Sequence, residues 1–147
     1  VFPAIALTMI RGDASRGLTA ILFLFAVVWA TDIFAYLAGR AFGGPKLAPR
    51  ISPKKTWAGA IGGAGAAVLA GSLLAIAVGK FDSHIPPVAL ALSVAAQLGD
   101  LAESWLKRRF GVKDSSHLIP GHGGVMDRVD GLVAAASLLY VLMAAAV

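Results

Sequence analysis

Four long apolar stretches constrain this chain more than any other feature of its sequence. They cover residues 18–42, 57–79, 87–110 and 125–147, and a helix needs roughly 20 apolar residues to cross a bilayer. Only 14% of the residues are charged, against roughly 25% in an ordinary soluble domain. The sequence therefore predicts an all-α polytopic membrane protein with four full transmembrane helices. Residues 1–10 are expected to be the end of a fifth.

The chain is expected to form a single transmembrane domain over residues 1–147. Because it starts with Val1 and an apolar segment follows at once, we interpret it as the C-terminal part of a longer protein. It contains no cysteine, which excludes disulfide bonds, a thiolate nucleophile and thiolate metal ligands within these residues. The span 57–79 is rich in Gly and Ala, a composition that lets neighbouring transmembrane helices approach closely.

The cations are divided unevenly between the two sides that four spans would define. Arg11, Arg16 and Lys80 fall on one side, and the rest of the 13 Lys and Arg residues fall on the other. An excess of Lys and Arg marks the cytoplasmic side of a membrane protein. We therefore expect the 43–56 and 111–124 loops on the cytoplasmic side of a cytoplasmic membrane. This face also explains the net charge of +5, so no nucleic-acid partner is expected.

Carboxylates inside the predicted spans need a partner or a use. Asp32 lies in the first span, and Asp100 and Glu103 lie in the third. An ionisable side chain at the centre of a span costs about 2.5–3.5 kcal/mol on insertion scales. Helical spacing places Asp100 and Lys107 on one face, with Gln97 and Glu103 beside it. A Glu103–Lys107 salt bridge is one interpretation of this stripe, but Asp100 has no cation one turn away.

A second polar segment, KDSSHLIPGHGGVMDRVDG (113–131), leads into the last span. Asp127 and Asp130 stand in its first turn, where acidic side chains also complement the helix dipole. The glycines of GHGG free backbone N–H groups to close on an anion at a helix start. Carboxylates beside a phosphate need a divalent cation between them, and Mg²⁺ suits that role. Because His117 and His122 lack a zinc spacing such as HExxH, the sequence favours Mg²⁺ over zinc.

The loop 43–56 supplies cations near the second span. Three prolines are expected to hold GGPKLAPRISPKKTWAG extended, and Lys54, Lys55 and Thr56 directly precede the span. Two lysines at a cytoplasmic helix end commonly act as topology signals or lipid-headgroup contacts. Here they share a side with the acidic, metal-suited segment. Cations, metal-binding carboxylates and a glycine-rich helix start together predict a polyphosphate site.

These residues resemble the signature of the phosphatidate cytidylyltransferases, also called CDP-diacylglycerol synthases. The run SWLKRRFGVKDSSHLIPGHGGVMDRVD (104–130) matches every position of the family's long pattern. SPKKTWAG (52–59) is similar to the family's second marker, and ATDIFAYLAGRAFG (30–43) is similar to its D-x-x-A-Y-x-x-G-R element. The resemblance covers nearly the whole chain and corresponds to the family's C-terminal half.

The resemblance implies the reaction CTP + phosphatidate → CDP-diacylglycerol + pyrophosphate, at the cytoplasmic face of the membrane. The lipid phosphate attacks the α-phosphorus of CTP, so no enzyme nucleophile is needed. The protein then supplies positioning and charge stabilisation. The resemblance also implies Mg²⁺, a second ion that would be K⁺, and a homodimer.

With this reaction in view, we assign roles to individual residues as hypotheses. The expected catalytic residues are Asp100, Lys113, Asp127, Arg128 and Asp130. Mg²⁺ is held by Asp100 and Asp127, and Glu103 and Asp130 support it or the second ion. The substrate phosphates are neutralised by Lys54, Lys55, Lys113 and Arg128, with Lys107 and Arg108 nearby. Hydrogen bonds and close backbone approach come from Ser52, Thr56, His122, Gly123 and Gly124. Asp32 and Tyr36 line the same cavity.

The spacing of the carboxylates leads to one geometric expectation. Asp100 lies ten residues before Phe110, about 15 Å along a helix, whereas Asp127 stands at the start of the next span. Both can contact one metal ion only if the third helix extends beyond the membrane surface or a polar funnel dips into the bundle. We expect a funnel that faces the cytoplasm.

Two alternative functions stay open. One is another CTP-dependent lipid enzyme, such as a polyprenol or phytol kinase. The other, from a different class, is an ion-coupled transporter, because intramembrane carboxylates also mark ion pathways.

Overall fold

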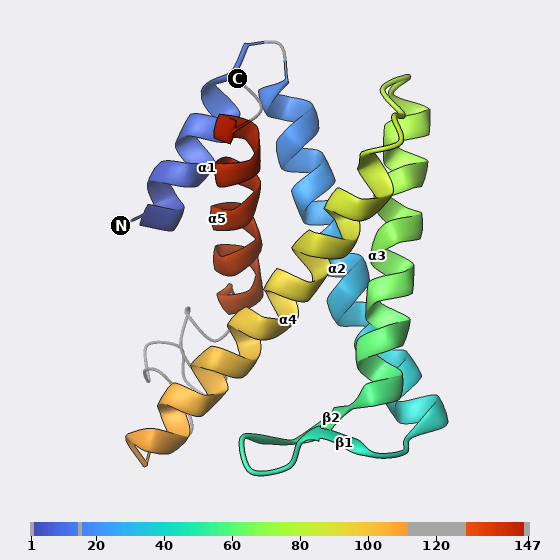
Figure 1. Ribbon diagram of the computed structural model, residues 1–147, viewed down its shortest axis with the longest axis vertical. Coiled ribbons are helices and arrows are strands. Elements are labelled where there is room, and N and C mark those ends of the chain that lie inside the picture. Colours follow the sequence, from blue (N-terminus) through green and yellow to red (C-terminus); the bar gives the residue numbers. More distant parts are fainter. Residues whose placement is uncertain (1, 15, 112–128, 146–147) are drawn as a thin grey trace, which may run out of the picture.

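The computed structural model describes residues 2–14, 16–111 and 129–145, and it is a helical bundle with a small hairpin at one end (Figure 1). The elements in chain order are α1 (Phe2–Gly12), α2 (Gly17–Phe42), β1 (Lys46–Ala48), β2 (Ser52–Thr56), α3 (Trp57–Ala77), α4 (Ile85–Arg109) and α5 (Asp130–Ala145).

Three of these helices are long enough and apolar enough to cross a membrane. They are α2, α3 and α4, with 26, 21 and 25 residues. They coincide with the predicted spans 18–42, 57–79 and 87–110 to within a few residues at each end. α5 covers 16 residues of the predicted span 125–147, and both ends of that span lie outside the described residues. α1 occupies the segment that was expected to end a fifth span.

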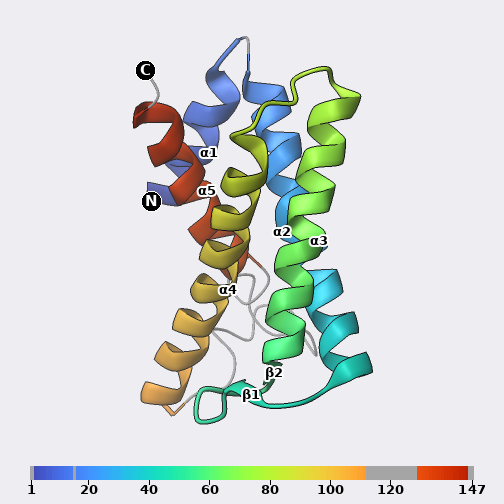
Figure 2. The same cartoon turned by 45° about the vertical axis from the view of Figure 1, so that its right-hand side comes forward.

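The helices diverge toward one end of the bundle (Figures 1 and 2). α2 lies beside α3, α1 contacts α5, and α4 crosses between these two pairs. α3 and α4 are close where residues 78–84 connect them, and they separate toward the other end. That other end carries β1, β2 and the C-terminal turns of α4, and we call it the hairpin end.

Small residues on α3 allow α2 to approach it closely. A Cβ atom at Gly63 would come within 2.7 Å of the Thr31 carbonyl oxygen, and one at Gly59 within 2.6 Å of the Ala35 carbonyl oxygen. The backbones of the two helices therefore touch without side chains between them, as at small-residue interfaces in membranes. This confirms that the Gly- and Ala-rich span is a packing face. The buried residues of α3 recur at every fourth position and are Gly59, Gly63, Ala67, Gly71 and Ala75.

A buried polar pair joins α2 to α4 in the middle of the bundle. The Thr31 hydroxyl donates to the Val27 carbonyl oxygen (2.8 Å) and pairs with the Ser93 hydroxyl (2.8 Å). Both Thr31 and Ser93 are fully buried. Each hydroxyl is thereby hydrogen-bonded, which removes the penalty for burying it among apolar side chains such as Leu24 and Leu92.

The start of α4 is set at the end opposite the hairpin. Asp82 Oδ1 accepts a hydrogen bond from the His84 backbone N–H (2.9 Å). This bond to the charged form holds the pKa of the Asp82 carboxyl below its ordinary value. Pro86 and Pro87 occupy the first turn, where their missing N–H groups cost no helical hydrogen bond.

The antiparallel hairpin corrects the all-α expectation. Ala48 pairs with Ser52 and Lys46 with Thr56, and the Ile51 backbone N–H donates to the Ala48 carbonyl oxygen at the turn (3.1 Å). From its prolines the sequence predicts an extended segment here, and the structure pairs this segment with itself as a hairpin. In a two-stranded sheet each strand keeps one unpaired edge, so a proline such as Pro53 can be accommodated there.

We predict that Gly63→Ala destabilises the protein relative to Gly65→Ala. A methyl group at Gly63 would press on the α2 backbone, whereas one at Gly65 meets nothing within 4 Å. Replacing Gly by Ala raises the helix propensity equally at both positions, so the difference between the two variants reports the packing. We expect the free energy of unfolding of Gly63→Ala to be about 1–3 kcal/mol lower than that of Gly65→Ala. Thermal unfolding of the purified full-length protein in detergent, followed by circular dichroism, measures it. Equal stability of the two variants would contradict the close α2–α3 contact.

Candidate active site

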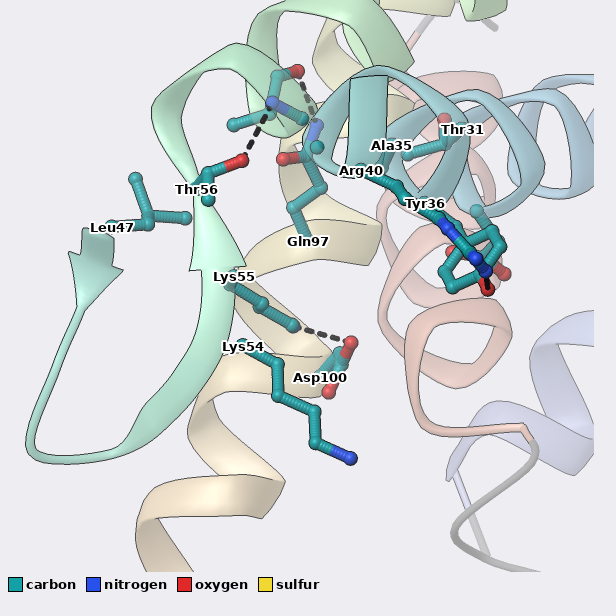
Figure 3. A pocket seen from close by; sticks show the side chains of 14 residues that line it. Thr31, Ala35, Tyr36, Arg40, Leu47, Lys54, Lys55, Thr56, Gln97 and Asp100 are labelled. Carbon is teal, nitrogen blue, oxygen red and sulfur yellow. Dashed lines mark hydrogen bonds and ion pairs between the residues drawn. The ribbon is translucent and has the colours of Figure 1, made fainter. Parts of the chain in front are cut away.

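A cavity of about 420 Å³ lies at the hairpin end, between α2, α4 and the hairpin, with the first turn of α3 in its wall (Figure 3). Its volume is within the range of small-molecule sites. Its lining brings together side chains from positions far apart in the sequence. The polar members of that lining are Thr31, Asp32, Tyr36, Arg40, Lys54, Lys55, Thr56, Gln97 and Asp100.

An ion pair between Lys55 Nζ and Asp100 Oδ2 crosses this cavity (Figure 3). The Lys55 side chain is 27% exposed and that of Asp100 is 39% exposed, so water screens the pair only in part. Ser104 Oγ also donates a long hydrogen bond to Asp100 Oδ1 (3.5 Å). α4 has no cation one turn away from Asp100. Lys55 of β2 supplies the positive charge instead. Figure 3 shows the Lys54 side chain extending from β2 on the same side.

Thr56 fixes the hairpin to the start of α3. Its hydroxyl oxygen accepts a hydrogen bond from the Gly59 backbone N–H (3.1 Å), which caps the helix. The side chain is buried, and a Cβ atom at Gly39 of α2 would come within 3.0 Å of its hydroxyl oxygen. Thr56 was predicted to bind substrate. The structure places it in the cavity wall with its oxygen engaged in the cap.

α2 contributes Asp32, Tyr36 and Arg40, each one turn after the last. All three line the cavity, and Arg40 Nη1 donates to the Tyr36 hydroxyl (3.0 Å). The structure thus brings Asp32 and Tyr36 together with Lys55 and Asp100, as the sequence interpretation required. Because they lie on one helical face, their spacing alone places them on the same side of α2.

A third carboxylate, Asp130, stands where α5 begins beside α4. A Cβ atom at Gly99 would come within 3.0 Å of the Asp130 carbonyl oxygen, so the start of α5 lies next to Asp100. Asp32 of α2 lines the same cavity as Asp100 and Lys55. Carboxylates from three helices therefore lie at this end of the bundle. Asp130 Oδ1 accepts a hydrogen bond from the Gly131 backbone N–H (2.7 Å).

Four other predicted site residues are placed away from the cavity lining. Glu103 faces Lys107, with Nζ 3.7 Å from Oε2 and both side chains largely buried, so the salt-bridge interpretation describes this pair. Arg108 Nε donates a long hydrogen bond to the Ile51 carbonyl oxygen of the hairpin turn (3.5 Å). Ser52 pairs with Ala48 in the hairpin.

Three polar lining residues, Thr31, Arg40 and Gln97, were not predicted as site residues. Arg40 was counted as a cation of the cytoplasmic side and falls in the D-x-x-A-Y-x-x-G-R element, but it was given no role in the site, although it follows Tyr36 by one turn and so lies on the same face of α2. Gln97 was placed beside the polar stripe of α4 but given no role. Gln97 Nε2 donates to the Ala60 carbonyl oxygen of α3 (3.2 Å). Helical spacing from Tyr36 could have identified Arg40, and spacing from Asp100 could have identified Gln97.

The remaining predicted residues lie outside the described part of the chain. They are Lys113, His122, Gly123, Gly124, Asp127 and Arg128. Within residues 2–14, 16–111 and 129–145, no three His, Asp or Glu side chains are close enough together to hold a metal ion by themselves.

Comparison with known proteins places this chain in one family. The model of the cytidylyltransferase family matches residues 1–146. A phosphatidate cytidylyltransferase of Brucella abortus biovar 1 is 64% identical over 140 residues, which cover 95% of this chain and 52% of the relative. The proteins of the same name from Haemophilus influenzae and Rickettsia bellii are 51% and 41% identical, over 84% and 82% of this chain and 45% and 55% of each relative.

This chain thus spans about half the length of the curated relatives that it matches. The family model nevertheless matches it almost from end to end, and the matched region includes every residue that lines the cavity. On this evidence the chain belongs to the cytidylyltransferase family.

Proposed function

We propose that this chain forms the part of a membrane enzyme that transfers the cytidylyl group of CTP to phosphatidate. The products would be CDP-diacylglycerol, a precursor in phospholipid synthesis, and pyrophosphate. The observation that carries the proposal is the Lys55–Asp100 ion pair, which sets a cation and a carboxylate in one cavity at the end of apolar helices. Membership of the cytidylyltransferase family supports the same activity.

The proposed reaction forms one P–O bond and breaks another. An oxygen of the phosphatidate phosphate attacks the α-phosphorus of CTP. The bond from that phosphorus to the oxygen shared with the β-phosphate breaks, and its electron pair leaves with pyrophosphate. Such a reaction needs no enzyme nucleophile, because positioning and electrostatic stabilisation of the phosphates supply the catalysis.

Lys54 and Lys55 would bind the phosphates of CTP and of the lipid. Both line the cavity, and Lys55 is held in place by Asp100, which limits the rotamers that its long side chain samples. A cation that is already oriented loses less conformational entropy when it binds a phosphate. Arg40, paired with the Tyr36 hydroxyl on the opposite wall, would add a third positive charge.

The carboxylates of the cavity suit a magnesium ion. Asp32 and Asp100 both line the cavity, and Mg²⁺ takes one or two carboxylates together with substrate phosphate oxygens. We therefore assign the ion to Asp32 and Asp100. Asp127 stays a predicted further ligand, and Glu103 and Asp130 stay predicted supports for Mg²⁺ or for K⁺. When bound, Mg²⁺ would offset the charge that develops on the phosphates.

The remaining features of the proposal follow from the sequence. The predicted phosphate contacts of Lys113, Arg128 and the GHGG glycines would complete the site. The excess of cations at the hairpin end supports the proposal that this end faces the cytoplasm at a bacterial inner membrane. The site would act within a homodimer of the full-length protein.

The packing between the cavity and the opposite end argues against a transporter. Leu24, Val27, Leu92 and Ala96 are fully buried along α2 and α4. An ion pathway would need polar groups or water there, and within the described helices this part of the bundle is apolar apart from the paired hydroxyls of Thr31 and Ser93.

Asp100→Asn should lower the rate of CDP-diacylglycerol synthesis by about 100-fold or more, because it removes the charge that holds Lys55 and the metal ion. The assay follows transfer of label from α-labelled CTP to phosphatidate by the full-length enzyme in detergent. Asp82→Asn is the matched control, since Asp82 lies in the connection at the opposite end. A wild-type rate in Asp100→Asn would remove this carboxylate from the mechanism.

Asp32→Asn and Asp100→Asn should each weaken binding of a divalent cation in the presence of CTP by about tenfold or more. Mn²⁺ can replace Mg²⁺ as a probe, because its electron paramagnetic resonance signal reports the free ion. The titration is run on full-length protein with CTP and without lipid, so no turnover is required. If both variants bind Mn²⁺ as tightly as Asp82→Asn does, the metal is held elsewhere.

A further inference from the structure

A second hollow lies next to the candidate active site, on the outer surface of the bundle. It has a volume of about 350 Å³ and runs between α3 and α4 where the two helices separate. Its walls are apolar side chains, and we call it the α3–α4 groove. The residues that define it are Trp57, Ile61 and Ala64 of α3 and Val94, Leu98 and Leu101 of α4.

The α3–α4 groove adjoins the cavity of the active site. Leu47, Ala60 and Gln97 line both. The hydrogen bond from Gln97 Nε2 to the Ala60 carbonyl oxygen spans the two helices at this boundary (Figure 3). Leu47, Ala60 and Gln97 therefore form the boundary between a surface suited to hydrocarbon and a cavity that contains Lys55 and Asp100.

We propose that the α3–α4 groove binds an acyl chain of the phosphatidate substrate while the lipid phosphate lies in the cavity beside Lys55. This inference rests on the proposed function. Phosphatidate joins an anionic headgroup to hydrocarbon chains, and the charges of Lys54 and Lys55 complement that headgroup. The groove allows the phosphate to reach the lysines while the chain stays in an apolar environment, which avoids exposing it to water.

Exposure of apolar side chains alone does not define the groove. Ile61 and Leu98 are 68% and 59% exposed, but Leu69 and Leu90 are 65% and 45% exposed as well. Leu69 and Leu90 line neither the groove nor the active-site cavity. Ile61 and Leu98 differ from the two leucines because they line a hollow that adjoins the polar site. Leu69 and Leu90, which lie outside it, serve as internal references.

The inference can be tested by photolabelling full-length protein in nanodiscs of phosphatidylcholine. Phosphatidate with a diazirine in one acyl chain is the probe, and phosphatidylcholine with the same chain is the comparison lipid. Mass spectrometry then locates the labelled residues. We expect the phosphatidate label to concentrate on 57–64 and 94–101 and the phosphatidylcholine label to spread over exposed positions, Leu69 and Leu90 included. An identical distribution for the two lipids would overturn the inference.

Two tryptophan variants test the groove by kinetics. Leu98→Trp narrows it and should raise KM for dioleoyl phosphatidate about tenfold, with KM for CTP and for dihexanoyl phosphatidate unchanged. Leu90→Trp, on the same helix but outside the groove, should alter none of these values. An unchanged KM for the long-chain lipid in Leu98→Trp would contradict the assignment.

The two tests separate this inference from the proposed function. If the unaltered enzyme makes no CDP-diacylglycerol, the proposed function fails, and the photolabelling pattern still reports whether phosphatidate occupies the groove. If the enzyme is active but the label and the KM values do not single out the groove, the function stands and the acyl chain lies elsewhere.

Discussion

The ion pair between Lys55 and Asp100 joins a two-stranded hairpin to the interior of an apolar helix, and the arrangement of the hairpin end depends on it. A carboxylate among apolar residues is costly unless it is paired. The partner can reach Asp100 only because β2 folds back over the bundle. That path is fixed by the Thr56 cap on α3 and by the close approach of Gly39 and Gly59 to it. The Thr56 cap and the glycine contacts thus bring Lys55 to Asp100, for which α4 itself supplies no cation.

The same helices pack tightly at one end and separate at the other, and this difference creates the site. Small residues hold α2 against α3, while α4 diverges from α3 toward the hairpin end. The divergence leaves a polar cavity on one side of Gln97 and an apolar groove on the other. A substrate with a charged headgroup and hydrocarbon chains needs both environments within its own length. The bundle offers them without exposing its buried core.

Much of this arrangement could be predicted from the sequence, because helix spans and helix faces follow from local periodicity. The run of apolar residues located three membrane-length helices, and spacing placed Asp32 and Tyr36 on one face. Tertiary contacts could not be predicted in this way. The hairpin that supplies Lys55 to Asp100 requires pairing across a turn, and its prolines suggested an unpaired strand. Helical spacing allowed both a salt bridge with Lys107 and a metal-supporting role for Glu103, and the structure shows the Lys107 contact.

We propose that one cavity, walled by α2, α4 and the hairpin, receives the triphosphate of CTP. An experimental density map of the full-length enzyme with Mg²⁺ and a non-hydrolysable CTP analogue would test this placement. We expect phosphate density between Lys55 and the carboxylates of Asp32 and Asp100. Density for the triphosphate at the end of the bundle near Asp82, or a map in which Asp32 and Asp100 face separate compartments, would contradict it.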